Sequence, residues 1–114
     1  MEQYRDELSG VFQALADPTR RAVIARLNRG PASVGDLAAP FAMALPSFMK
    51  HIRFLEGSGL IRTRKAGRVR MCEIEKRQLL AAEGWLSEQR ALWDSRADRL
   101  EDFVARLQKE GRPT

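Results

Sequence analysis

Apolar residues recur at helical spacing near the start of the chain. Over residues 3 to 16 they stand three or four positions apart, which predicts a first amphipathic helix. The apolar positions are Tyr4, Leu8, Val11 and Leu15, with Phe12 beside them. Asp17 and Pro18 end this helix and begin the next, since an aspartate can cap free amides and proline suits the first helical position.

Two further short helices follow. The second has its apolar face at Ala22, Val23, Ile24 and Leu27. Gly30 and Pro31 stop it, because glycine accepts a left-handed cap and proline cannot continue a helix. Ser33 then resembles the start of a capping box and opens a third helix that runs through Ala39.

A fourth helix and a hairpin occupy the middle of the chain. From Leu45 to about Ser58, one helical face carries Phe48, Ile52 and Leu55, and another carries Ser47, Lys50 and Arg53. The residue at its N-cap position, Ala44, has no side-chain acceptor. Two short runs, 61–65 and 69–74, are then separated by Ala-Gly-Arg at 66–68, which predicts a β-hairpin.

The last part of the chain repeats apolar residues every seven positions. The repeat consists of Leu79, Leu86, Trp93, Leu100 and Leu107. A helix over residues 77–108 would be roughly 48 Å long at 1.5 Å per residue, so we expect this stripe to join a second copy of the chain. Two alternatives stay open at this point: a kink or break at Gly84, and packing of the stripe within one monomer.

The positive charge is concentrated in the middle of the chain. Residues 1–42 have a net charge of 0 and residues 73–114 of −1, whereas residues 43–72 have seven basic side chains against Glu56, a net +6. The basic residues are Lys50, Arg53, Arg62, Arg64, Lys65, Arg68 and Arg70. Such a segment is typical of proteins that bind polyanions, nucleic acid first among them. The alternative is a solvated strand pair whose arginines serve solubility.

Size and composition exclude several classes of protein. With 114 residues, 44% of them hydrophobic, we expect one domain over residues 1–114. A single cysteine, Cys72, and a single histidine, His51, argue against a metal site or a cofactor. No arrangement of residues typical of an enzyme is found. The sequence has neither a membrane span nor a signal-peptide pattern, so we expect a cytoplasmic protein without a membrane partner.

Several segments together resemble one protein family. Residues 12–24 read FQALADPTRRAVI, residues 33–38 read SVGDLA, residues 45–61 read LPSFMKHIRFLEGSGLI, and residues 64–70 read RKAGRVR. These segments resemble the ArsR family of bacterial winged helix-turn-helix transcriptional repressors. The resemblance implies a mainly α (α+β) fold with a two-stranded β-wing and a long C-terminal dimerisation helix. It also implies a homodimer joined through residues 1–16 and 75–108.

The resemblance and the charge pattern together give a set of DNA-binding residues. The helix at 45–58 would enter the major groove and the wing at 61–74 would contact flanking DNA, with Lys50 and Arg53 at base edges. The residues expected at DNA are Leu45, Pro46, Ser47, Met49, Lys50, His51, Arg53, Arg64, Lys65, Arg68 and Arg70. The residues expected at the dimer interface are Tyr4, Leu8, Phe12, Trp85, Leu86, Trp93, Leu100, Phe103 and Leu107.

The sequence departs from the family at a few positions. Met49 stands where relatives often have serine, and would offer an apolar contact to thymine methyl groups. The third and last helices lack the cysteines and histidines of metal-sensing members, so metal sensing is not expected. Cys72 is expected to be buried. His51 either touches a phosphate or is packed and hydrogen-bonded where helices meet.

We therefore expect a homodimeric DNA-binding repressor controlled by an unknown inducer, if by any. The alternative is a winged-helix module that binds proteins and has no specific affinity for DNA. Salt-insensitive association without DNA binding would favour that alternative.

Overall fold

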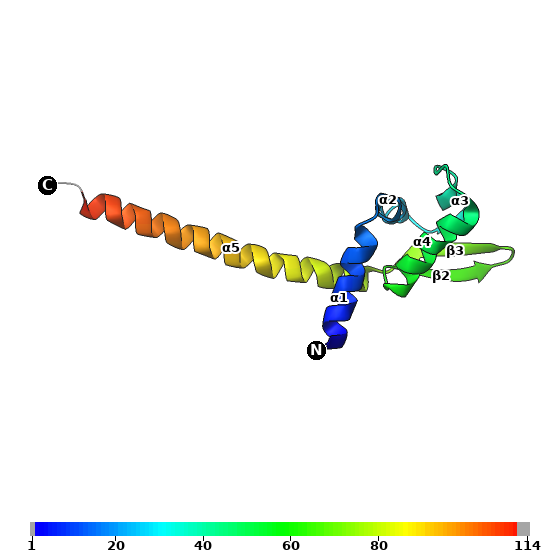
Figure 1. Cartoon of the computed structure of the whole chain (residues 1–114), viewed down its shortest axis with the longest axis horizontal. Helices are drawn as coiled ribbons and strands as arrows, with labels where there is room; N and C mark the ends of the chain where they lie inside the picture. Colours follow the sequence, from blue (N-terminus) through cyan, green and yellow to red (C-terminus); the bar gives the residue numbers. More distant parts are fainter. Residues whose placement is uncertain (1, 112–114) are drawn as a thin grey trace. The chain divides into compact units, whose positions relative to one another are not determined.

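A computed structural model describes the backbone of residues 2–111 and the side chains of residues 7–111. It divides into two compact units, with the boundary after Ala82. The first contains four whole helices and a small sheet, shown from blue to green in Figure 1, together with the first residues of the last helix. The helices are α1 (Glu2–Leu15), α2 (Pro18–Leu27), α3 (Val34–Ala38) and α4 (Leu45–Gly57).

The helix ends follow from local side chains. Asp17 caps α2 by accepting a hydrogen bond from the Arg20 amide at 3.0 Å, and Ser33 caps α3 by accepting one from the Asp36 amide at 3.1 Å. No side chain caps α4, since Ala44 stands at its N-cap. The helices predicted from the sequence are confirmed in number and order.

Two details of the second helix were predicted wrongly. It ends at Leu27, earlier than Gly30 suggests, and Gly30 takes its positive φ of 131° in the loop beyond. Ala22, which was assigned to the apolar face, is exposed, while Val23, Ile24 and Leu27 are buried. Ala22 directly precedes the buried residues Val23 and Ile24, and the helix is short. Periodicity alone therefore does not show that Ala22 lies outside the apolar face.

The sheet is antiparallel and has three strands in the order β1-β3-β2. The predicted hairpin is present as β2 (Ile61–Ala66) and β3 (Val69–Ile74), with Ala66 paired to Val69. Its two-residue turn requires a positive φ, which Gly67 adopts at 66° without steric cost. The third strand, β1 (Ala32–Ser33), was not predicted because two residues are too few to show alternation.

The core of the first unit lies between the helices and the sheet. Phe48, Ile52 and Leu55 of α4 are at most 1% exposed and meet residues from α1, α2, α3 and the strands. Burying a side chain of this size contributes about 1.5–3 kcal/mol. These contacts fix which face of α4 points inward, and therefore which face remains available to a ligand.

The last helix, α5 (Lys76–Glu110), is a single helix of 35 residues, coloured yellow to red in Figure 1. The break at Gly84, which the sequence left open as an alternative, does not occur, because one glycine costs only about 1 kcal/mol in a helix this long. Ala82 belongs to the core of the first unit. None of the described helices is long and apolar enough to cross a membrane.

Candidate nucleic-acid interface

The outward face of α4 presents polar and basic side chains. Pro46, Ser47, Lys50 and Arg53 are exposed, and Leu45 in the first turn is 56% exposed. Lys50 and Arg53 form no hydrogen bond or ion pair with any residue among positions 7–111. Their charges are therefore available to an anionic partner.

Met49 lies differently from the other predicted α4 residues. It is half-buried and packs against the core instead of standing fully on the outward face. Only part of the Met49 side chain could reach a thymine methyl group. Met49 is therefore a weaker candidate for a DNA contact than the exposed Lys50 and Leu45 of the same helix.

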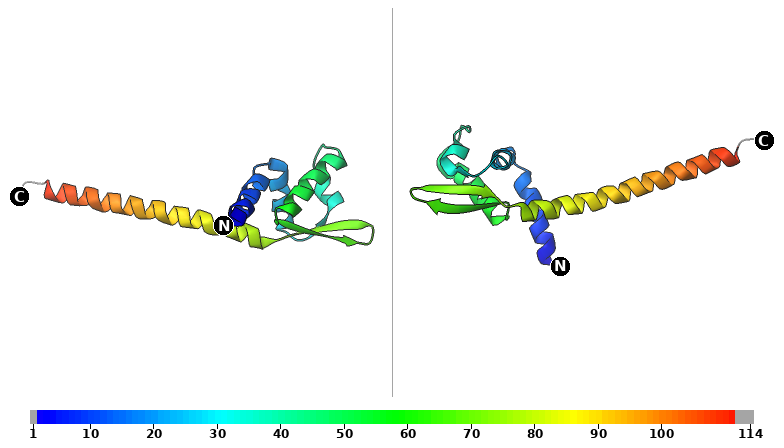
Figure 2. Two further views of the ribbon diagram at one scale, coloured as in Figure 1. Left: turned by 60° about the horizontal axis from the view of Figure 1, so that its bottom comes forward. Right: turned by 180° about the vertical axis from the view of Figure 1, so that it is seen from behind.

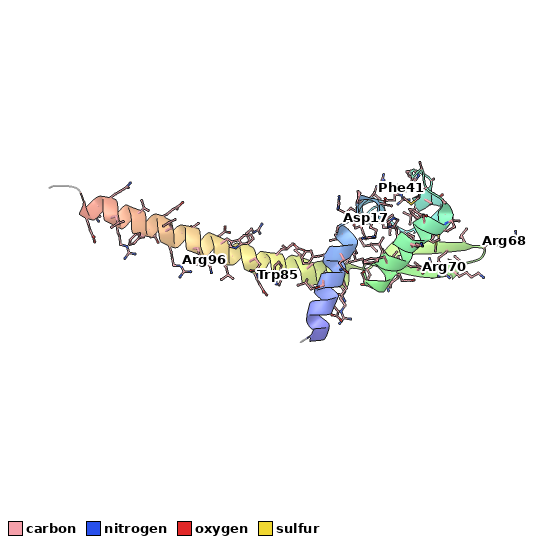
Figure 3. All side chains as sticks on the ribbon, in the orientation of Figure 1. Asp17, Phe41, Arg68, Arg70, Trp85 and Arg96 are labelled. Carbon is pink, nitrogen blue, oxygen red and sulfur yellow. The ribbon has the colours of Figure 1, made fainter. Side chains whose placement is uncertain are left out.

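The hairpin carries the second group of cations. Arg64, Lys65 and Arg68 are exposed and have no hydrogen-bond or ion-pair partner in the described part of the chain. Arg68 stands in the two-residue turn at the tip of the hairpin (Figure 3), and both views in Figure 2 show this tip extending past the neighbouring helices. These cations can approach a surface that the helices do not reach.

Two arginines of the basic segment are already held by protein groups. Arg62 forms ion pairs of 3.2 Å with both Glu73 and Glu75. Arg70 donates to Thr63 Oγ1 at 3.0 Å, and the Thr63 hydroxyl donates to the Glu56 carboxylate of α4. The net charge of the segment therefore overstates the number of cations free to bind, and the Thr63 hydroxyl joins the wing to α4.

A junction that the sequence analysis missed holds α4 in place. Arg20 of α2 donates from Nε to the Ala14 carbonyl and from Nη2 to the Gln13 carbonyl, both at 2.8 Å. Its guanidinium carbon lies 4.3 Å from the centre of the Phe54 ring, a cation–π contact with α4. One side chain thus joins the end of α1 to α2 and to α4. The only sequence signal was the Asp-Pro-Thr-Arg motif, whose partners on α4 lie more than 30 positions away in the chain.

His51 belongs to the same junction. Its Nδ1 lies 3.2 Å from Arg20 Nη1 and 3.7 Å from Asp17 Oδ2. Because arginine only donates, Nδ1 of His51 is the acceptor in a hydrogen bond from Arg20. The geometry favours the packed, hydrogen-bonded interpretation of His51 over the phosphate contact.

Asp17 is the acidic member of this junction. The hydrogen bond from the Arg20 amide holds the pKa of Asp17 below its ordinary value. Partial burial opposes this effect, and the Arg20 charge and the Thr19 amide add to it. At neutral pH Asp17 is therefore an anion that caps α2 and faces the positive side of the junction.

Cys72 lies on β3 between Ala32 and Thr63 and is fully buried. Burial raises the pKa of its thiol, the nearby Glu56 adds to this, and Arg70 opposes it. The expectation of a buried cysteine is confirmed. Within residues 7–111 there is no group of three or more histidine, cysteine or acidic residues that could hold a metal ion.

The residues predicted for dimerisation are distributed over both units. Leu8 is half-buried against the core, Phe12 is 37% exposed, and the side chain of Tyr4 lies outside the described residues. The residues on α5 are each between 42% and 62% exposed: Trp85, Leu86, Trp93, Leu100, Phe103 and Leu107. This exposure leaves a long apolar stripe along one helix.

Two curated relatives share much of this sequence. The profile of a helix-turn-helix domain family matches residues 15–64. The HTH-type transcriptional regulator Rv2034 of Mycobacterium tuberculosis is 37% identical over 81 residues, which is 71% of this chain and 75% of the relative. The transcriptional repressor SdpR of Bacillus subtilis is 33% identical over 60 residues, or 53% of this chain and 67% of SdpR.

Solved structures agree with both the sequence and the fold. The crystal structure of the ArsR family transcriptional regulator RHA00566 is 67% identical, covers 80% of this chain and 94% of its own, and has a TM-score of 0.77. The homodimeric winged helix-turn-helix DNA-binding domain of Mycobacterium bovis Mb0332, at 20% identity, shares the fold with a TM-score of 0.59 over 82% of this chain and 84% of its own. The predicted winged-helix fold and the family resemblance are thus confirmed: the chain belongs to the ArsR family of winged helix-turn-helix transcriptional regulators.

Proposed function

We propose that this chain forms a homodimer that binds operator DNA in a sequence-specific manner and represses transcription. The observation that carries this proposal is the set of exposed cations without protein partners on α4 and the wing: Lys50, Arg53, Arg64, Lys65 and Arg68. An exposed cation without an acidic neighbour gains most from a phosphate or a base edge. No enzymatic activity forms part of this function.

The outward face of α4 would enter the major groove. Lys50 and Arg53 stand one turn apart on that face, where long basic side chains suit guanine O6 and N7. Leu45, Pro46 and Ser47 form the first turn beside them. Because no side chain caps α4, its first free amides can also receive a backbone phosphate.

The wing would add affinity more than specificity. Arg64, Lys65 and Arg68 are placed for phosphates or for a minor groove flanking the site. Arg70, which is bonded to Thr63, would act chiefly by holding the wing in register with α4. His51 contacts Arg20 of α2 and would help to orient α4 from its protein-facing side.

Dimerisation would use α1 and the stripe of α5. The seven-residue repeat of exposed apolar side chains from Leu86 to Leu107 suits a second copy, because an unpaired stripe of this length is costly in water. Mb0332 is homodimeric and SdpR is a repressor, which supports the same assembly and action here. The whole chain would then act as a single winged-helix domain with dimerisation helices at 1–16 and 75–108.

Selection of binding sites from random double-stranded DNA tests this function. We expect wild-type protein to enrich an inverted repeat, because a twofold dimer reads two half-sites about one helical turn apart. Arg53→Ala should relax the preference at one base pair in each half-site, whereas Arg21→Ala, on α2, should leave the enriched sequence unchanged. Recovery of no common sequence by wild-type protein would contradict specific binding and favour a protein-interaction module.

A further inference from the structure

An open cavity lies beside the helices that precede α4. It has a volume of about 560 Å³ and is formed by α2, α3 and the residues that follow α3. Its floor contains Val23 and Leu37, which are 1% and 2% exposed, and Phe41 forms one wall. On the α2 side the small side chain of Ala22 leaves space. Cavities of this volume with an apolar floor are typical of small-molecule sites.

The rim of this cavity carries two arginines, one on α2 and one just after it. Arg26 lies in the last turn of α2 and Arg29 in the turn that follows the helix, and both line the cavity. Arg26 Nη1 donates to the Gly30 carbonyl at 3.3 Å, and neither arginine has a carboxylate within ion-pair distance in the described part of the chain. Asp36 of α3 is the single acidic group of the lining, so the charge of the rim is positive.

We propose that this cavity binds a small amphipathic carboxylate. The apolar body of the ligand lies against Val23, Leu37 and Phe41, and its carboxylate accepts hydrogen bonds from Arg26 and Arg29. Guanidinium groups suit this task because their planar donors match the two oxygens of a carboxylate. Asp36 disfavours ligands with a second anionic group and limits the class to monoanions.

The cavity has a direct contact with the anchor of α4. The ring of Phe41 lies 5.6 Å from that of Phe48, centre to centre, with a tilt of 31° between the planes. Phe48 is fully buried and holds α4 on the core. A ligand that moves the Phe41 ring therefore acts on α4 through one aromatic contact. The resulting loss of operator affinity rests on the DNA binding proposed above, whereas ligand binding itself does not.

Ligand binding is tested without DNA by two-dimensional NMR of the full-length protein. The probes are octanoate, 4-phenylbutanoate and indole-3-acetate, each beside its uncharged primary amide. We expect at least one carboxylate to give saturable shifts centred on Val23, Leu37 and Phe41, with a Kd of about 1 mM or lower. Its amide should bind at least about tenfold more weakly, because it lacks the charge that the arginines pair with.

Three variants assign the binding to this cavity. Ala22→Leu fills the space from an exposed helix position and should abolish the shifts, and Arg29→Ala should weaken binding about fivefold or more. Asp36→Asn removes the repelling charge and should strengthen it. All three lie on the surface, so circular dichroism should show an unchanged fold. Absence of saturable shifts with every probe up to about 10 mM, or shifts unaffected by Ala22→Leu, would overturn the proposal.

The effect on DNA is measured separately with the selected operator. Reciprocal linkage requires that a ligand which lowers operator affinity also binds the DNA complex more weakly by the same factor. A cavity that binds the probe while the protein binds no operator would refute the proposed function alone. Operator binding that the bound probe leaves unchanged would refute only the link through Phe41.

Discussion

At the scale of single residues, Arg20 contributes most to the placement of the recognition helix. It bonds two carbonyls at the end of α1, meets His51 and covers the Phe54 ring. We expect Arg20→Lys to lower the free energy of unfolding by about 1–3 kcal/mol, because an ammonium group cannot make these contacts together. Urea denaturation measures this change.

The neighbouring Arg21 provides a matched control. It makes a single hydrogen bond, to the Leu15 carbonyl at 2.7 Å, and is exposed. Arg21→Lys should therefore change stability by less than about 0.5 kcal/mol. Equal effects of the two substitutions would show that the junction at Arg20 is not what holds α4.

Asp17 gives the protein an acid-sensitive contact. Its pKa lies below the ordinary value of 3.8 in the folded state, so folding favours the carboxylate. The stabilisation is complete above the unfolded-state pKa and is lost as the pH falls through the lower folded-state pKa. Asp17→Asn keeps a cap and removes the charge. We expect the variant to lose less stability than wild type as the pH falls from about 5 to about 2. Thermal unfolding at a series of pH values measures this loss, and curves of stability against pH that run parallel for the two proteins would contradict the prediction.

Residue contacts of this kind explain what the sequence could not predict. Arg20 and His51 are 31 positions apart, and no periodic pattern marks such a pair. The same holds for Arg62, which contributed to the predicted basic segment but is neutralised by Glu73 and Glu75. Charge counting along a chain does not show which charges meet after folding.

At the scale of elements, the sequence predicted most of the fold. Asp17 and Ser33 mark two helix starts, Ala44 marks the uncapped one, and alternation marks the hairpin. These features act over a few residues and can be read locally. β1 could not be predicted, because only its pairing with Met71 and Cys72 of β3 makes Ala32–Ser33 a strand.

The tip and the base of the hairpin should differ in their effect on DNA. Arg68→Ala removes a free cation and should flatten the dependence of log K on log salt by about 1 for every sequence tested. Arg62→Ala removes the same formal charge, but Arg62 is already paired with Glu73 and Glu75. The slope of log K against log salt should therefore change less for this variant than for Arg68→Ala. Fluorescence anisotropy over a salt series measures both. Equal slopes for the two variants would indicate that net charge, not the free cation, governs binding.

At the scale of the whole molecule, function depends on two copies acting together. Leu100 on the α5 stripe is 62% exposed in the single chain. Leu100→Glu should therefore give a monomer, because it places like charges in the proposed seam. Ser95→Glu, on the same helix but off the seven-residue repeat, should remain dimeric. Sedimentation velocity distinguishes these states, and a dimeric Leu100→Glu would remove this stripe from the interface.

The central claim is that a dimer reads a specific DNA sequence. The most direct test is fluorescence anisotropy of the purified protein on the DNA upstream of its own gene, against scrambled DNA of equal composition, over a salt series. We predict tighter binding to the upstream DNA, with log K falling against log salt at a slope of roughly −5 to −9, as about six to ten phosphate contacts require. Equally weak binding to both DNAs, and to the sites recovered by selection, would contradict it.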